Sequence, residues 1–232
     1  MTIKICVPII AKKPSDIPAL IKRARALGAD LAEVRLDYLE DEFDEGEVEA
    51  AIKNAEIPLI ATNRQLEHGG KGLQDKDMRV KKLVALADKG FSMVDIETVV
   101  PNLKSVVKRL KRKGVEVIVS YHDFNKTPSL KELQKVASSQ IRAGADICKI
   151  VTKANNINDN ITCLSLTSEM SMKTRIVCFA MGTLGILSRI LTPIFGSYFT
   201  YASLESEMET AAGQINIQKL KEIYRCLGAM GN

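Results

Sequence analysis

The chain has 232 residues, of which 46% are hydrophobic and 26% charged, and its formal net charge is +5. This is an ordinary globular composition, and the length is within the range in which an α/β barrel forms one domain. The N-terminal apolar run is broken by Lys4 and Pro8, and no stretch reaches the length of a membrane span. We therefore expect a soluble protein without a signal peptide or a membrane partner.

Basic residues gather over 108–113, where they end an amphipathic helical pattern. Cations at that place suit the negative end of the helix dipole, and the chain has no Trp and few aromatic residues. A nucleic-acid interface would combine basic and aromatic side chains on one surface. We therefore expect a solvated helix face here and no nucleic-acid partner.

The cysteines and histidines argue against a metal site. Five cysteines occur without paired close spacing, which excludes a disulfide framework and a zinc motif, and only two histidines are present. We expect no metal and no cofactor, and we expect the reducing cytoplasm as the location.

Strand and helix patterns alternate along the whole chain. We predict in order a strand over 3–10, a helix over 14–27, a strand over 31–37, a helix over 44–54, a strand over 58–62, a helix ending near 90, a strand over 91–97, a helix over 101–114, a strand over 115–122, a helix over 128–144, a strand over 146–152, a helix over 158–170, a strand over 174–181, a helix over 184–191, a strand over 198–204 and a helix over 213–227. Glycines end several of these helices, and Pro101 begins one.

These segments make about eight strand–helix units, which predict parallel strands. Eight units in this length favour a (β/α)8 TIM barrel, a single domain over residues 1–232. The alternative is an open Rossmann-like sheet, but no Gly-x-Gly-x-x-Gly turn follows the first strand.

Charged residues stand within strands that should be almost wholly apolar. Glu33, Arg35 and Asp37 alternate with period 2, which places them on one face, and Asp95 and Glu97 do the same near the end of the fourth strand. For Asp37, Asp95 and Glu97 we favour a structural layer of buried ion pairs.

Lys149 stands at the centre of the sixth strand, and His122 ends the fifth, at the rim where β/α barrels hold their active sites. Burial disfavours the ammonium form of a lysine, which leaves an amine that can act as a nucleophile. The alternative interpretations are a structural Lys149–Glu ion pair and a hydrogen-bonded structural histidine. We favour catalysis through Lys149 and His122.

A glycine-bearing turn, Met181-Gly-Thr-Leu-Gly185, follows the seventh strand and leads into a helix that carries Arg189. An anionic group, phosphate or carboxylate, could be held there.

Taken together, these motifs resemble those of the type I 3-dehydroquinate dehydratases, over nearly the whole chain. The resemblance rests on Glu33-Val-Arg-Leu-Asp37, Ser120-Tyr-His-Asp-Phe124, Lys149, the series from Met181 to Arg189, Phe195-Gly-Ser197 and Gly213-Gln-Ile215. It implies a homodimeric (β/α)8 barrel without a metal, a hydro-lyase that converts 3-dehydroquinate to 3-dehydroshikimate in the shikimate route to aromatic amino acids.

The resemblance also assigns roles to residues. Lys149 would form an imine with the substrate ketone, and His122 would act as general base and then as general acid. Arg189 would bind the substrate carboxylate through its planar fork. The hydroxyl groups would be held, and the pocket closed, by Glu33, Arg35, Arg64 and Gln214, with the Thr210 hydroxyl as a further donor.

Three positions depart from the family pattern. Pro8 stands where some relatives have Ser in the first strand, which costs one ladder hydrogen bond and one possible substrate contact. The third-strand loop, Arg64-Gln-Leu-Glu-His68-Gly-Gly70, has His68 where the family has the Glu that supports its catalytic His, with Glu67 beside it. Either Glu67 turns inward or His122 works without that carboxylate. Thr210 stands where a Ser is common.

Two other functions remain open from the sequence. A class I aldolase also uses a barrel lysine and an imine, but it explains neither the His122 segment nor the Glu33 and Arg35 strand. The second alternative is a non-catalytic barrel that binds the same cyclic acid. The presence of His68 in place of the supporting Glu would be the sequence feature that indicates it.

Overall fold

The computed structural model describes residues 3–40, 43–71, 75–204 and 214–230. Its parallel strands are β1 (Ile5–Ile9), β2 (Leu31–Arg35), β3 (Leu59–Thr62), β4 (Met93–Glu97), β5 (Glu116–His122), β6 (Ile147–Lys153), β7 (Arg175–Met181) and β8 (Thr200–Tyr201). Its α-helices are α1 (Ile17–Ala26), α2 (Glu45–Ile52), α3 (Lys76–Leu86), α4 (Leu103–Lys111), α5 (Leu130–Ala143), α6 (Asp159–Ser171), α7 (Ile186–Leu191) and α8 (Ile217–Cys226). No helix within these ranges is both long and apolar enough to cross a membrane.

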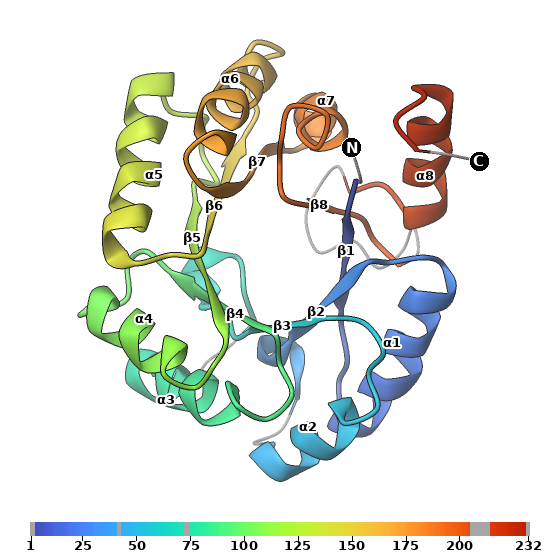
Figure 1. Ribbon diagram of the computed structural model, residues 1–232, viewed down its shortest axis with the longest axis vertical. Helices are drawn as coiled ribbons and strands as arrows, with labels where there is room; N and C mark the ends of the chain where they lie inside the picture. The colour runs from blue at the N-terminus through green and yellow to red at the C-terminus, as the bar shows by residue number, and fades with distance from the viewer. Residues whose placement is uncertain (1–2, 41–42, 72–74, 205–213, 231–232) are drawn as a thin grey trace.

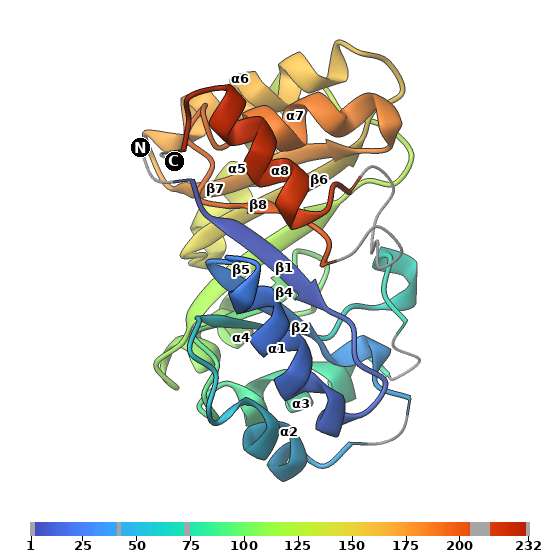
Figure 2. The same ribbon diagram turned by 90° about the vertical axis from the view of Figure 1, so that its right-hand side faces the viewer.

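The strands form one sheet in which each strand from β1 to β6 pairs with the next strand along the chain, and β8 pairs with β1. The order is β7-β6-β5-β4-β3-β2-β1-β8, and every pair is parallel. The helices surround the strands (Figures 1 and 2). Between β7 and the segment that leads into β8, the Tyr198 N–H donates to the carbonyl oxygen of Ile176 at 2.7 Å, so the barrel is nearly closed. The predicted (β/α)8 single-domain fold is confirmed, and the open Rossmann-like alternative is wrong.

Local sequence signals account for where the elements begin and end. At the start of α5, Ser129 and Glu132 form a reciprocal capping box, and the helix ends at Gly144 with φ +97°. That backbone conformation favours glycine because it has no Cβ atom. The prediction of a helix over 128–144 is therefore right to within two residues at its start and one at its end.

Most predicted strands are shorter in the structure, and for two of them the reason is plain. The strand predicted over 31–37 ends at Arg35, and Leu36–Tyr38 form a 3-10 turn that carries the chain over the rim. The strand predicted over 198–204 is reduced to Thr200–Tyr201, because its ladder runs only along β1. The expected last helix begins at Ile217 rather than Gly213, which lies outside the described residues, and the side chain of Asn216 caps it.

The inside of the barrel changes from apolar to charged toward the carboxyl ends of the strands. One interior cluster includes Cys6, Leu31, Ile60, Met93, Ile118, Ile147, Val177 and Phe199. Two residues further along several of these strands come buried charges, among them Glu33, Asp95 and Lys149. Two further apolar clusters pack the outer faces of the strands against the helices. The polar groups are therefore gathered at one end of an otherwise apolar core.

Candidate active site

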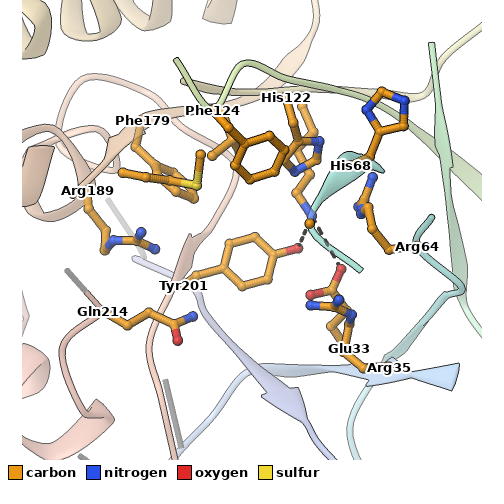
Figure 3. Close-up of a pocket in the computed structure, with 14 residues that line it drawn as sticks. Glu33, Arg35, Arg64, His68, His122, Phe124, Phe179, Arg189, Tyr201 and Gln214 are labelled. Atoms are coloured by element: carbon orange, nitrogen blue, oxygen red, sulfur yellow. Dashed lines mark hydrogen bonds and ion pairs between the residues drawn. The ribbon is translucent and has the colours of Figure 1, made fainter. Parts of the chain in front are cut away.

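A cavity opens at this charged end of the barrel, with a volume of about 480 Å³ including its mouth. It is lined by Glu33, Arg35, Arg64, His68, Gly69, His122, Phe124, Lys149, Val151, Phe179, Met181, Arg189, Tyr201 and Gln214. Figure 3 shows how the labelled side chains converge on it. Seven of the eight predicted site residues are therefore brought together, and Thr210 lies outside the described residues.

Lys149 lies at the floor of the cavity with its side chain only 5% exposed. Its Nζ atom donates to Asp95 Oδ2 at 2.9 Å, Glu33 Oε1 at 3.3 Å and the Tyr201 hydroxyl oxygen at 2.8 Å (Figure 3 draws the Glu33 and Tyr201 bonds). The structural ion pair that the sequence left open is thus present, and Lys149 also lines the cavity. The two interpretations of Lys149 are compatible.

Asp95 is held by cations and a hydroxyl. Its Oδ1 atom lies 2.9 Å from Arg64 Nη2 and accepts a 2.6 Å hydrogen bond from Ser120, which in turn accepts from Arg64 Nη1 at 2.7 Å. Burial alone would raise the pKa of Asp95, but the Arg64 guanidinium and the Lys149 ammonium lower it. The carboxylate is therefore ionised at neutral pH.

The predicted layer of ion pairs is confirmed. Arg35 bonds Asp37 through both nitrogens of its fork, at 2.9 and 2.7 Å, although Asp37 lies beyond the end of the strand rather than within it. Glu97 pairs with Arg79 at 2.9 Å. Arg79 is fully buried and also donates to the Asn63 carbonyl oxygen. This pairing could not be predicted from the sequence, because Arg79 belongs to a helix and its partners come from two other segments.

His122 lies at the end of β5, one inward-facing position above the level of Lys149. The register pairs Ser120 with Lys149 and His122 with Val151 on the neighbouring strand. Its ring stacks on Phe124, with the ring centroids 5.9 Å apart and the planes 12° from parallel. Loss of contact with water lowers the pKa of His122 well below its ordinary value of 6.5, and the charges of Arg64 and Lys149 lower it further. The imidazole is thus neutral at pH 7 and able to accept a proton.

The Nδ1 atom of His122 is buried and has no hydrogen-bond partner among the described residues. On the loop after β3, Glu67 is exposed whereas His68 lines the cavity. Gly69 allows this loop to pack closely against Phe124. Its φ is +78°, and a Cβ atom at this position would lie 2.6 Å from Cζ of Phe124. His68, rather than Glu67, therefore faces the cavity, and it does so without supplying His122 with a carboxylate.

The opposite wall carries Arg189 and Gln214, across the cavity from Glu33 and Arg35 (Figure 3). Arg189 comes from α7 and is 1% exposed, and its guanidinium lies 4.2 Å from the centre of the Phe179 ring. The turn before it is tight, since a Cβ atom at Gly185 would lie 2.4 Å from the Ala180 carbonyl oxygen. A permanent cation in an otherwise apolar wall is suited to an anionic group of a ligand.

Comparison with known proteins identifies the family. The sequence model of the type I 3-dehydroquinases matches residues 5–230. The chain belongs to the type I 3-dehydroquinase family. It is 39% identical to a 3-dehydroquinate dehydratase of Dehalococcoides mccartyi over 94% of this chain and 96% of the relative, and 36% identical to one of Methanosarcina acetivorans over 95% and 93%. The family is one of hydro-lyases that act in the shikimate pathway.

Solved structures agree with this assignment. The type I 3-dehydroquinate dehydratase of Clostridium difficile, solved with covalently modified comenic acid, has a TM-score of 0.86 and 32% identity, covering 97% of this chain and 92% of that one. A deoxyribose phosphate aldolase from Aeropyrum pernix has a TM-score of 0.58 at 15% identity over 98% and 89%, which shows only a shared fold. The aldolase alternative therefore has no support beyond the architecture.

Several residues that line this 3-dehydroquinase cavity were not predicted. Phe124, Phe179 and Met181 form an apolar part of the wall, and Tyr201 reaches Lys149. The period-2 alternation of Phe199 and Tyr201 could have placed both inside the barrel. No group of three or more His, Cys, Asp or Glu side chains within the described ranges could hold a metal ion.

Proposed function

We propose that this 3-dehydroquinase dehydrates 3-dehydroquinate through an imine at Lys149. The observation that carries the proposal is the juxtaposition of a buried amine at the cavity floor with a histidine one inward position above it on the neighbouring strand. Attack of the Nζ lone pair on the ketone and loss of water give an iminium ion. This cation withdraws electrons from the adjacent carbon, which can then lose a proton.

His122 is the proposed general base. A neutral imidazole can take the proton from the carbon beside the iminium, so that the electron pair of the C–H bond moves into the enamine. The resulting imidazolium then returns a proton to the hydroxyl on the next carbon, and that group leaves as water. Hydrolysis of the product imine releases 3-dehydroshikimate and the free amine.

The rest of the cavity is proposed to hold the ring. Arg189 binds the carboxylate on one wall, while Glu33, Arg35 and Arg64 hold hydroxyl groups on the other. Gln214 closes the mouth, and the hydroxyl of Thr210, which lies outside the described residues, is a further donor to the substrate. The support for Arg189 is its burial beside Phe179, since a guanidinium with little water around it binds a carboxylate more strongly than an exposed one.

We further propose that residues 1–232 act as one catalytic domain in a cytoplasmic homodimer. The support is the resemblance to the family together with the free cysteines, four of which are buried as thiols. Sedimentation at micromolar concentration would test the dimer, and a monomeric species there would contradict it.

The test of the function is turnover of 3-dehydroquinate, followed by the absorbance of the conjugated enone product. The wild type should convert the substrate, whereas Lys149→Ala and His122→Ala should each lose at least about 10²-fold in kcat, the lower end of what a positioned acid or base contributes. A wild type that binds the substrate but never forms the enone would favour the non-catalytic alternative.

A further inference from the structure

The hydroxyl of Tyr201 lies at the reacting nitrogen. Tyr201 comes from β8, and its pairing with Cys6 on β1 sets its height in the barrel. The side chain is buried, its oxygen lies 2.8 Å from Lys149 Nζ, and the ammonium lies 4.6 Å from the centre of its ring. Edge contacts with Phe179 and Phe199, at centroid distances of 6.1 and 5.4 Å, hold the ring in this place.

Tyr201 differs in one chemical respect from the other two partners of Lys149. Asp95 is fixed by Arg64 and Ser120, and its lowered pKa prevents it from keeping a proton at neutral pH. Glu33 already accepts a hydrogen bond from Thr62 on the same Oε1 atom, at 2.7 Å. A phenol hydroxyl, in contrast, can accept a hydrogen bond and donate one at the same time.

Burial beside Glu33 and Asp95 raises the pKa of Tyr201 well above 10, because each of these influences disfavours a phenolate. The hydroxyl therefore keeps its proton at neutral pH. When Lys149 is an ammonium, the oxygen accepts from it, as the structure has it. When the nitrogen has lost a proton and carries a lone pair, rotation of the hydroxyl allows it to donate.

Imine formation involves proton transfers that such a group can serve. An ammonium and a ketone give an iminium and one water molecule, so two of the three nitrogen protons must end on the departing oxygen. Both transfers occur over the short distance between the nitrogen and the carbonyl oxygen. No net proton is gained or lost, and a relay that returns to its starting state needs no co-reactant.

We propose that Tyr201 is a further catalytic residue, whose hydroxyl relays these protons between Lys149 and the substrate carbonyl oxygen when the imine forms and when it is hydrolysed. In each transfer the phenol gives its own proton to the oxygen and takes one from the nitrogen. In hydrolysis the sequence runs in reverse. The proposal rests on the imine at Lys149 proposed above, and it adds a residue to the steps that make and break that imine.

The experiment separates imine formation from proton abstraction. Wild type and Tyr201→Phe are mixed with excess 3-dehydroquinate, quenched with borohydride at increasing times, and weighed as intact protein. Removing the hydroxyl should slow the appearance of the adduct by at least about tenfold, because positioned proton transfer contributes about 10²–10⁴ and water can replace part of it. KM should change little, and the deuterium isotope effect for substrate labelled at the abstracted position should fall toward unity.

Tyr198→Phe is the matched control, since it removes a hydroxyl from the same segment outside the cavity, where it contacts Arg175 at 3.4 Å. This variant should trap the adduct at the wild-type rate. An unchanged trapping rate in a folded Tyr201→Phe protein would overturn the relay. If Tyr201→Phe does not fold, the rate of imine formation by the wild type is measured in H2O and in D2O. A rate that is no slower in D2O contradicts the relay. A wild type that never forms an adduct would instead refute the imine.

Discussion

The loop that carries His68 offers the sharpest perturbation of this site. His68 lines the cavity, Glu67 beside it is exposed, and the buried Nδ1 atom of His122 has no partner within the described residues. Replacing His68 by Glu would place a carboxylate at the cavity wall on the side of His122 and Arg64. We expect that carboxylate to accept a hydrogen bond from Nδ1 and to stabilise the imidazolium.

The magnitude follows from the charges. Two unit charges about 4 Å apart attract by about 4 kcal/mol at an effective dielectric constant of about 20. Desolvation of the new carboxylate offsets part of this attraction, and the remainder should raise the pKa of His122 from its lowered value. Because a negative neighbour favours the protonated form, the acid limb of kcat/KM should move to higher pH, while turnover above the limb should be kept or increased.

The assay is the pH profile of kcat/KM for wild type and His68→Glu, with Glu67→Gln as the matched control. Glu67 is exposed, so its substitution should leave the profile where it is. A fall of more than about tenfold in turnover with an unmoved acid limb, in a protein that remains folded, would refute this reasoning. It would show that His68 has a role of its own.

Three further predictions follow from the buried charges. The acid limb of wild-type kcat/KM should lie below pH 6.5, since burial lowers the pKa of His122, and a pH series from 4 to 8 checks this. Arg189→Lys should raise KM about 10–100-fold with a smaller effect on kcat, because an ammonium cannot form the bidentate pair of hydrogen bonds that a guanidinium makes with the substrate carboxylate. Asp95→Asn should lower the free energy of unfolding by about 3–5 kcal/mol in urea at pH 7, since Arg64 is left buried without its carboxylate. The lowered pKa of Asp95 means that its contribution is present above about pH 4 and is lost as the pH falls further, so the variant and wild type should converge in acid.

The main architecture was predictable because parallel strands that are covered on both faces must be apolar. A charge within such a strand therefore has to point into the barrel, and this consideration predicted the positions of Glu33, Arg35 and Lys149. His122 was predicted because it ends a strand, and the active sites of β/α barrels lie at the carboxyl ends of the strands. These inferences need only the residue types and the period of a strand. They are accordingly robust to errors of a few residues in the element boundaries.

The remaining features depend on geometry that a single sequence does not encode. Tyr201 reaches Lys149 because the register between β1 and β8 sets its height, and registers join segments far apart in the chain. The choice between Glu67 and His68 depends on a 3-10 turn followed by a left-handed Gly69. Arg64 lines the cavity as expected, but its pairing with Asp95 and Ser120 could not be predicted, because three separate segments of the chain bring these groups together.

The imine at Lys149 is the central claim, and chemical trapping tests it most directly. The protein is incubated with 3-dehydroquinate, reduced with borohydride, digested, and its peptides are weighed by mass spectrometry, with Lys149→Arg as the control. We expect a ligand-sized mass increase on the peptide that contains Lys149 and no adduct in the control. An adduct on another lysine, or ligand binding without any adduct, would contradict it.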